Sequence, residues 1–140
     1  SRGFVRYRTE LADGFAPAVF SVDEVRDRAW VSLDGDPVGV LARELHERVI
    51  LLPRATGTLD VLVEDEGRVN YGPRIGEPKG LIGPARLAGR PLTGWQAASV
   101  DLDAVVDAAT RAPVRALAAG ANVFRAVFEL DRPGDLALST

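Results

Sequence analysis

The chain has 140 residues, enough for one domain with a sizeable core, and 46% of them are hydrophobic. It carries 17 Lys and Arg residues against 20 Asp and Glu residues, a net charge of −3. That balance gives no general electrostatic attraction to nucleic acid or to an anionic membrane, so neither partner is expected. With no cysteine and one histidine, disulfides are excluded, and neither a metal nor a cofactor is expected.

The chain also lacks methionine, which indicates a processed or internal piece of a longer polypeptide. Almost all of its cationic residues are arginines, because Lys79 is the single lysine. A strong preference for arginine is typical of GC-rich bacterial coding. The compartment stays unknown, with the cytoplasm slightly favoured over secretion.

Short apolar or alternating runs separated by turn residues predict a β-rich domain. In chain order the expected strands are Phe4–Leu11, Ala18–Val22, Arg28–Leu33, Val38–Leu41, Arg48–Leu52, Thr58–Glu64 and Leu81–Leu87. Asp34-Gly35 predicts a hairpin turn, and Ala88-Gly89-Arg90-Pro91 predicts another reversal. Many strands at this spacing indicate an all-β sandwich or barrel over residues 1–100.

The pattern changes near Val100. Asp101 is a candidate cap for a short helix, and Pro113 would end that helix. Residues 101–120 are therefore expected to form a helical or irregular connector. Alternation returns over Asn122–Leu130, so residues 121–140 are expected to supply strands of a following β domain or strands packed back on the sandwich.

Two acidic residues and the histidine are the candidates for catalysis. Glu64 and Glu66 would share a strand face if the extended geometry persists, as a glycosidase pair requires, but a solvated strand end explains them better. His46 lies in a polar turn, with no serine, cysteine or orienting acid at a fixed spacing. No catalytic residue is therefore predicted in this chain.

The glycines and aromatic residues of the middle segment have structural explanations too. Gly72, Gly76, Gly80 and Gly83 do not match a phosphate-binding loop and are typical of tight turns. Trp30 lies mid-strand and is expected in the core. Trp95 follows a turn, where core packing is favoured over a surface role. Tyr71 lies in an irregular loop, where an aromatic side chain is often held for recognition.

Several segments form a recognisable set in chain order: Phe4–Thr9, Val25–Val31, Val38–Leu41, Leu59–Glu64, Lys79–Leu81 and Leu92–Trp95. The most specific element is Gly67-Arg68-Val69-Asn70-Tyr71-Gly72. Together, along nearly the whole chain, these segments resemble the non-catalytic β region of β-galactosidases of glycoside hydrolase family 35. The chain departs from the family at Asp65, where asparagine is usual, although aspartate still permits an Asx turn.

The resemblance implies a galactose-binding-domain-like jelly roll that packs against a catalytic TIM barrel and a second β domain of the same parent chain. It implies that two glutamates in the barrel, absent here, release terminal β-linked galactose with retention. Tyr71 would approach the rim of the sugar site, and Arg68 and Asn70 would hold its loop by hydrogen bonds.

Two other functions stay open from the sequence. An autonomous carbohydrate-binding module would bind galactosides through exposed, coplanar aromatic rings and convergent polar groups. An unrelated interaction sandwich of the immunoglobulin or fibronectin type would make Gly67–Gly72 a plain hairpin loop.

Overall fold

The structure, a computed structural model, describes residues 3–116 together with residues 122–125, 127, 129 and 134. The chain divides into two compact units, Ser1–Leu102 and Asp103–Thr140. The strands are β1 (Phe4–Gly14), β2 (Ala18–Ser21), β3 (Glu24–Arg26), β4 (Arg28–Leu33), β5 (Asp36–Ala42), β6 (Val49–Leu52), β7 (Ala55–Glu64), β8 (Gly80–Ile82), β9 (Arg86–Leu87), β10 (Arg90–Pro91) and β11 (Gln96–Ser99). A 3₁₀ turn (Arg43–Leu45) follows β5, and the helix is α1 (Leu102–Arg111).

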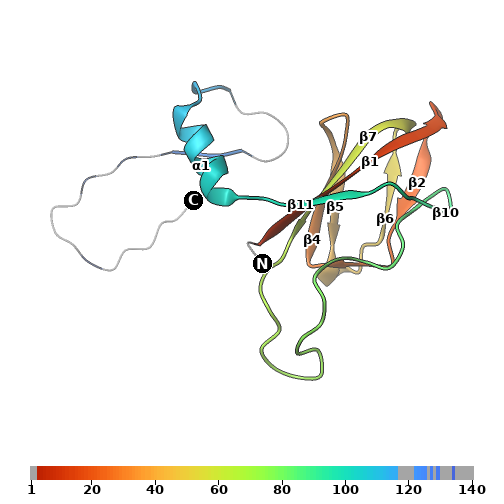
Figure 1. Cartoon of the computed structure of the whole chain (residues 1–140), viewed down its shortest axis with the longest axis horizontal. Helices are drawn as coiled ribbons and strands as arrows, with labels where there is room; N and C mark the ends of the chain where they lie inside the picture. Colours follow the sequence, from red (N-terminus) through yellow and green to blue (C-terminus); the bar gives the residue numbers. More distant parts are fainter. Residues whose placement is uncertain (1–2, 117–121, 126, 128, 130–133, 135–140) are drawn as a thin grey trace. The chain divides into compact units, whose positions relative to one another are not determined.

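The strands of the first unit form two main antiparallel sheets (Figure 1). One has the order β11-β1-β7-β4-β5, and the other has the order β10-β9-β2-β6. A third, two-stranded sheet pairs β3 with β8. The all-β sandwich expected from the sequence is confirmed.

The core is a single cluster of buried side chains contributed by both main sheets. In β7, Leu59, Val61 and Val63 are buried, while the residues between them are half-buried on the opposite face. The smaller sheet supplies Phe20 and Leu52, which are both fully buried. Alternation along strands such as β4 and β7 buries one face of the five-stranded sheet, and this face packs against buried side chains of the smaller sheet.

Most of the predicted strands are confirmed, although several extend further than expected. The strand over Arg28–Leu33 has the predicted bounds as β4. Asp34 and Gly35 form the turn that follows, with φ values of 52° and 86°, so both positions of the hairpin loop have positive φ. The sequence did not predict β3 and β11, which are short.

The single strand predicted over Leu81–Leu87 is wrong. The segment contains two strands in different sheets, because β8 pairs with β3 whereas β9 pairs with β2. Gly83, at φ 75°, and Pro84 separate them. A positive φ followed by a residue that lacks an N–H interrupts a ladder, which the apolar pattern alone does not reveal. The reversal predicted next is confirmed as the β9–β10 hairpin.

The core position expected for Trp30 is also wrong. Its neighbours Ala29 and Val31 point inward and are buried, so Trp30 lies on the outer face of the five-stranded sheet, where it is half-buried. Its ring packs against that of Phe4, with centroids 6.3 Å apart. Trp95 is half-buried against the core, and its Nε1 donates to the carbonyl of Leu92 at 3.3 Å.

Helix α1, the helix expected in the 101–120 segment, begins at Leu102, the last residue of the first unit, and continues into the second unit. The helix has no buried residue, and Leu102, Val105 and Val106 are exposed among the described residues. Of the strand expected over 122–130, residues 126, 128 and 130 lie outside the described residues, and residues 122–125, 127 and 129 are described with no regular secondary structure. No helix of the described residues is long and apolar enough to cross a membrane.

The position of the core predicts that alanine substitutions at Leu59 and Leu51 change the free energy of unfolding by different amounts. Replacing fully buried Leu59 by alanine should lower the free energy of unfolding by about 2–5 kcal/mol, because a cavity is left between the sheets. Leu51→Ala, on the exposed face of β6, is the matched control and should change it by less than about 0.5 kcal/mol. Urea denaturation followed by tryptophan fluorescence measures both, and equal losses would contradict this assignment of the core.

Candidate functional site

The segment between β7 and β8, residues 65–79, holds the three site residues predicted from the sequence; we call it the Tyr71 loop. The side chain of Tyr71 is 89% exposed, and Arg68 and Asn70 are exposed as well. Within the described part of the chain, neither Arg68 nor Asn70 forms a side-chain hydrogen bond or ion pair. The loop is therefore fastened by other residues in this structure.

One hydrogen bond inside the loop was predicted from the sequence. The amide of Gly67 donates to Asp65 Oδ1 at 2.9 Å, which is an Asx turn. The prediction that aspartate preserves this turn is confirmed. The four glycines expected in tight turns, Gly72, Gly76, Gly80 and Gly83, all have positive φ.

Gly80, which begins β8, has a further reason to be glycine. Its φ is 108°, and a Cβ at this position would collide with the hydroxyl of Tyr7. The backbone of the loop's exit thus approaches β1 more closely than a side chain would allow.

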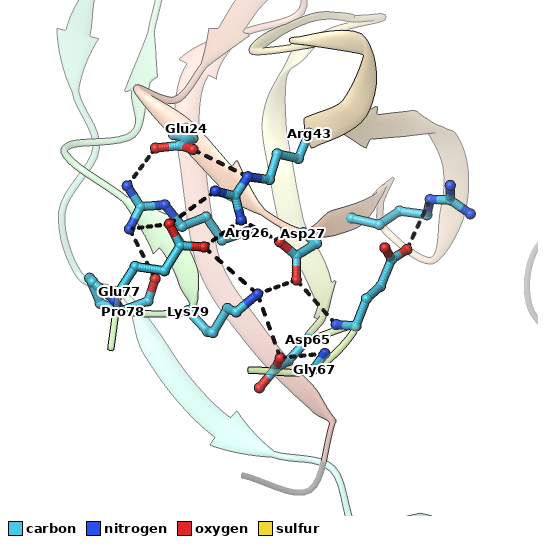
Figure 2. A network of polar contacts seen from close by, with 11 residues as sticks. Glu24, Arg26, Asp27, Arg43, Asp65, Gly67, Glu77, Pro78 and Lys79 are labelled. Carbon is cyan, nitrogen blue, oxygen red and sulfur yellow. Dashed lines mark hydrogen bonds and ion pairs between the residues drawn. The ribbon is translucent and has the colours of Figure 1, made fainter. Parts of the chain in front are cut away.

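The base of the loop is held by a cluster of charged side chains, shown in Figure 2. We call it the ion network, and it comprises Glu24, Arg26, Asp27, Arg43, Asp65, Glu77 and Lys79. At its centre is Asp27, which lies between β3 and β4 and is 7% exposed. A buried carboxylate is costly unless it is paired and hydrogen-bonded, so its partners decide whether this arrangement is stable.

Asp27 has three hydrogen-bond donors to its carboxylate. Lys79 Nζ donates to Oδ2 at 2.6 Å, and Arg43 Nη1 donates to Oδ1 at 2.8 Å. The backbone amide of Glu66 completes the set at 3.2 Å from Oδ2. Both oxygens are therefore satisfied, two of the donors are cationic, and two of the three come from the Tyr71 loop.

Arg43 extends the network to the far end of the loop. Its Nη1 and Nη2 atoms donate to the two carboxylate oxygens of Glu77 at 2.5 and 2.9 Å, a bidentate pair. Beside it, Arg26 donates to Glu24 at 2.6 Å and to the carbonyl of Pro78 at 3.1 Å.

The electrostatics follow from these contacts. Burial raises the pKa of Asp27, but the hydrogen bonds from Lys79 and Arg43 outweigh it and leave the pKa below the usual 3.8. The Arg43 guanidinium lowers the pKa of Glu77 below the usual 4.5. Glu77, in turn, together with Asp27, raises the pKa of Arg43. Both carboxyl groups are consequently ionised at neutral pH.

A cavity of about 550 Å³ lies beside the network, under the loop. It is lined by apolar Val5 and Val63 and by charged Arg26, Arg68 and Lys79, among others. Arg68 thus faces a cavity whose wall the network builds, whereas Tyr71 does not line it.

The side chains of Glu66 and His46, the other candidates from the sequence, do not belong to the ion network, although both residues line a further cavity of about 400 Å³ with Asp27 and Arg43. Strand β7 ends at Glu64, so Glu66 is beyond the strand, is exposed, and has its carboxylate 3.9 Å from Nε of Arg28. His46 is an exposed residue at φ 56° that ends the 3₁₀ turn. Among the described residues, no group of three or more His, Cys, Asp or Glu side chains could hold a metal ion.

Asp27 was missed from the sequence although a signal was present. Val25, Asp27, Ala29, Val31 and Leu33 alternate, and all five are buried. A carboxylate therefore occupies a core-facing position of a strand pattern. That position demands cationic partners from elsewhere in the chain, and the single lysine of the sequence supplies one.

Comparison with known proteins identifies the family. The family described as "Beta-galactosidase, first all-beta domain" matches residues 1–101. The β-galactosidases of Mus musculus and Homo sapiens are 42% and 41% identical to this chain over 108 and 107 residues, 74% of the chain in each case. That of Xanthomonas manihotis is 41% identical over 98 residues, 68% of the chain.

These alignments cover 17%, 16% and 16% of the three relatives, so the chain spans about a sixth of their length. The chain belongs to the β-galactosidase family as its first all-β domain. This membership overturns the immunoglobulin or fibronectin alternative.

The ion network predicts acid lability. Because the pKa values of Asp27 and Glu77 are lowered on folding, their stabilising contribution is fully present above the usual values of 3.8 and 4.5. It is lost as the pH falls through the lower folded-state values. The free energy of unfolding should be nearly flat from pH 7 to pH 5 and should fall below about pH 4. Urea denaturation across this pH range provides the measurement.

Asp27→Ala tests the same network at constant pH. The change leaves Arg43 and Lys79 without their shared carboxylate and should cost about 3 kcal/mol at pH 7, the low end for breaking a buried pair, because both cations keep other carboxylates nearby. The free energy of unfolding of the Asp27→Ala variant should also vary less with pH below pH 4 than that of the unaltered chain. If the free energy of unfolding of Asp27→Ala fell below pH 4 as steeply as that of the unaltered chain, groups other than Asp27 would cause the loss of stability in acid.

Proposed function

We propose that this chain is the non-catalytic β-sandwich domain of a larger β-galactosidase of glycoside hydrolase family 35, in which it braces the catalytic barrel and helps to shape the rim of the sugar site. The parent enzyme hydrolyses terminal β-galactosides with retention, by two glutamates of its barrel. The domain itself contributes no catalytic group.

The observation that carries this proposal is the Tyr71 loop. An 89%-exposed aromatic side chain stands on a loop whose base is fixed by a buried ion network. An exposed aromatic ring leaves apolar surface in contact with water unless a partner covers it. The hydrogen-bonded base of the Tyr71 loop fixes the place of this ring, which supports a role in recognition. A neighbouring domain that carries the sugar site supplies such a partner.

The remaining length of the relatives supports the same view. The chain matches about a sixth of each relative, so most of a β-galactosidase lies outside the matched region. The second partner we propose is a further β domain of the same parent chain, reached through the segment that contains α1.

The described residues do not favour an autonomous carbohydrate-binding module. Such a module stacks sugars on exposed, coplanar rings, but Trp30 and Trp95 are both half-buried. The Trp30 ring packs on Phe4, and the Trp95 ring packs on the core. Among the described residues, the exposed aromatic residues besides Tyr71 are Phe15 and Phe124, and neither lies in the Tyr71 loop.

Tyr71→Ala in the full-length enzyme should lower kcat/KM for an aryl β-galactoside by roughly tenfold, equivalent to about 1.4 kcal/mol. The loss should appear mainly in KM, because a rim contact holds substrate and transition state alike. Steady-state kinetics of the variant measure it. Tyr71→Phe, which keeps the ring, is the control and should retain more of the activity, while unchanged kinetics in Tyr71→Ala would contradict a rim role.

The 140-residue chain alone should not hydrolyse the same substrate above the uncatalysed rate. The catalytic glutamates that the proposal assigns to the barrel lie outside this chain, so no residue here replaces them. A chromogenic assay of the purified chain, repeated after a second purification step, measures this. Turnover that survives repurification would overturn the proposal.

A further inference from the structure

The Tyr71 loop has little internal structure to fix its shape. Besides the Asx turn, its internal backbone bonds run from Ile75 to Gly72 at 3.3 Å and from Glu77 to Arg74 at 3.1 Å. Its apolar side chains add little, since that of Ile75 is 64% exposed. A segment with so few buried contacts opens easily unless something outside it holds it.

Asp27 holds both ends of this loop with one carboxylate oxygen. Oδ2 accepts from the amide of Glu66 at the loop's start and from Nζ of Lys79 at its end. Residues 66 and 79 are thus joined through a single atom. The sheets fix the chain as far as Glu64 and again from Gly80, and this tie extends the fixed part into the loop at Glu66 and Lys79.

Asp27 is itself fixed in the sandwich by its backbone. Its amide donates to the carbonyl of Glu64 at 2.8 Å, and its carbonyl accepts from the amide of Arg43 at 2.9 Å. Arg43 then holds Glu77 through two hydrogen bonds and Asp27 Oδ1 through another. The rigid sheet is therefore connected to the loop by charged groups rather than by apolar packing.

We infer that Asp27 is the positioning residue of the Tyr71 loop, with Lys79 and Arg43 as its partners. It touches no substrate. It sets where Tyr71 stands by fixing the loop at both ends. What Tyr71 then does for the parent enzyme rests on the proposed function, but the positioning itself is a property of this chain.

Hydrogen exchange of the 140-residue chain, followed by mass spectrometry, tests the positioning directly. In Asp27→Asn and in Lys79→Met, whose uncharged side chain is slightly shorter than that of lysine, the loop amides that donate hydrogen bonds should exchange at least tenfold faster than in the unaltered chain; these are the amides of Glu66, Gly67, Ile75 and Glu77. Amides of β4 and β7 should keep their protection.

Arg54→Met is the matched control. It removes a hydrogen-bonded ion pair with Asp34 at 2.5 Å. That pair lies at the opposite end of the sandwich, since β4 runs from Arg28 beside Glu64 to Leu33 beside Leu59. Exchange in residues 66–78 should be unchanged in this variant.

Two results would overturn the inference. One is loop exchange within twofold of the unaltered chain in both variants. The other is loss of protection across β4 and β7 in both, which would show that the network supports the whole sandwich and does not position the loop. If Asp27→Asn alone loses the sheet, Lys79→Met decides, because its backbone and Asp27 remain in place.

Kinetics of the full-length enzyme separate this inference from the proposed function. If Asp27 acts through Tyr71, Lys79→Met should raise KM as Tyr71→Ala does, and combining the two should add little. Faster loop exchange without any change in KM would overturn the rim role of Tyr71 and leave the positioning role of Asp27 supported. Unchanged exchange with a raised KM in Lys79→Met would overturn the positioning role.

Discussion

The local structure around the site depends on one buried carboxylate. Asp27 occupies a core-facing position of a strand, 7% exposed, where an ionised group without partners would be strongly destabilising. Its desolvation is offset by two cations and a backbone amide, all within hydrogen-bonding distance. Those donors come from residues 16 or more positions away, so the requirement of one side chain brings the 3₁₀ turn after β5 and both ends of a surface loop to the same place.

Such an arrangement separates two tasks within one small domain. Apolar side chains of two sheets fix the sandwich, and charged side chains fix the loop that leaves it. A loop fastened by apolar packing would need a larger hydrophobic cluster of its own. Charge-assisted hydrogen bonds are directional, so they specify the loop's position with few residues.

The sequence predicted the parts of the structure that depend on local patterns. Strand β4 and its Asp-Gly turn follow from alternation and turn chemistry, and the Asx turn at Asp65 follows from the side chain alone. The error over Leu81–Leu87 arose because an apolar run does not show which sheet each half joins. Trp30 was misplaced because its mid-strand position was taken to indicate the core, although alternation along its own strand places it on the opposite face from Ala29 and Val31.

The candidate site was predicted in part. The loop and its exposed tyrosine were identified by resemblance, but the network beneath them joins residues 39 and 52 positions apart, and no local pattern encodes such pairings. The carboxylate in a core-facing register was the one clue available in the sequence.

Lys79 gives the domain a property that is independent of its role in any enzyme. It is the only lysine of the chain, so its side chain carries the only side-chain amine, and that amine is the group that Asp27 holds. An acylating reagent must reach Nζ, whose access is restricted while it donates to the Asp27 carboxylate and the side chain is 16% exposed. The rate of covalent labelling at Lys79 should therefore report how often the contact between Lys79 and Asp27 at the base of the loop opens.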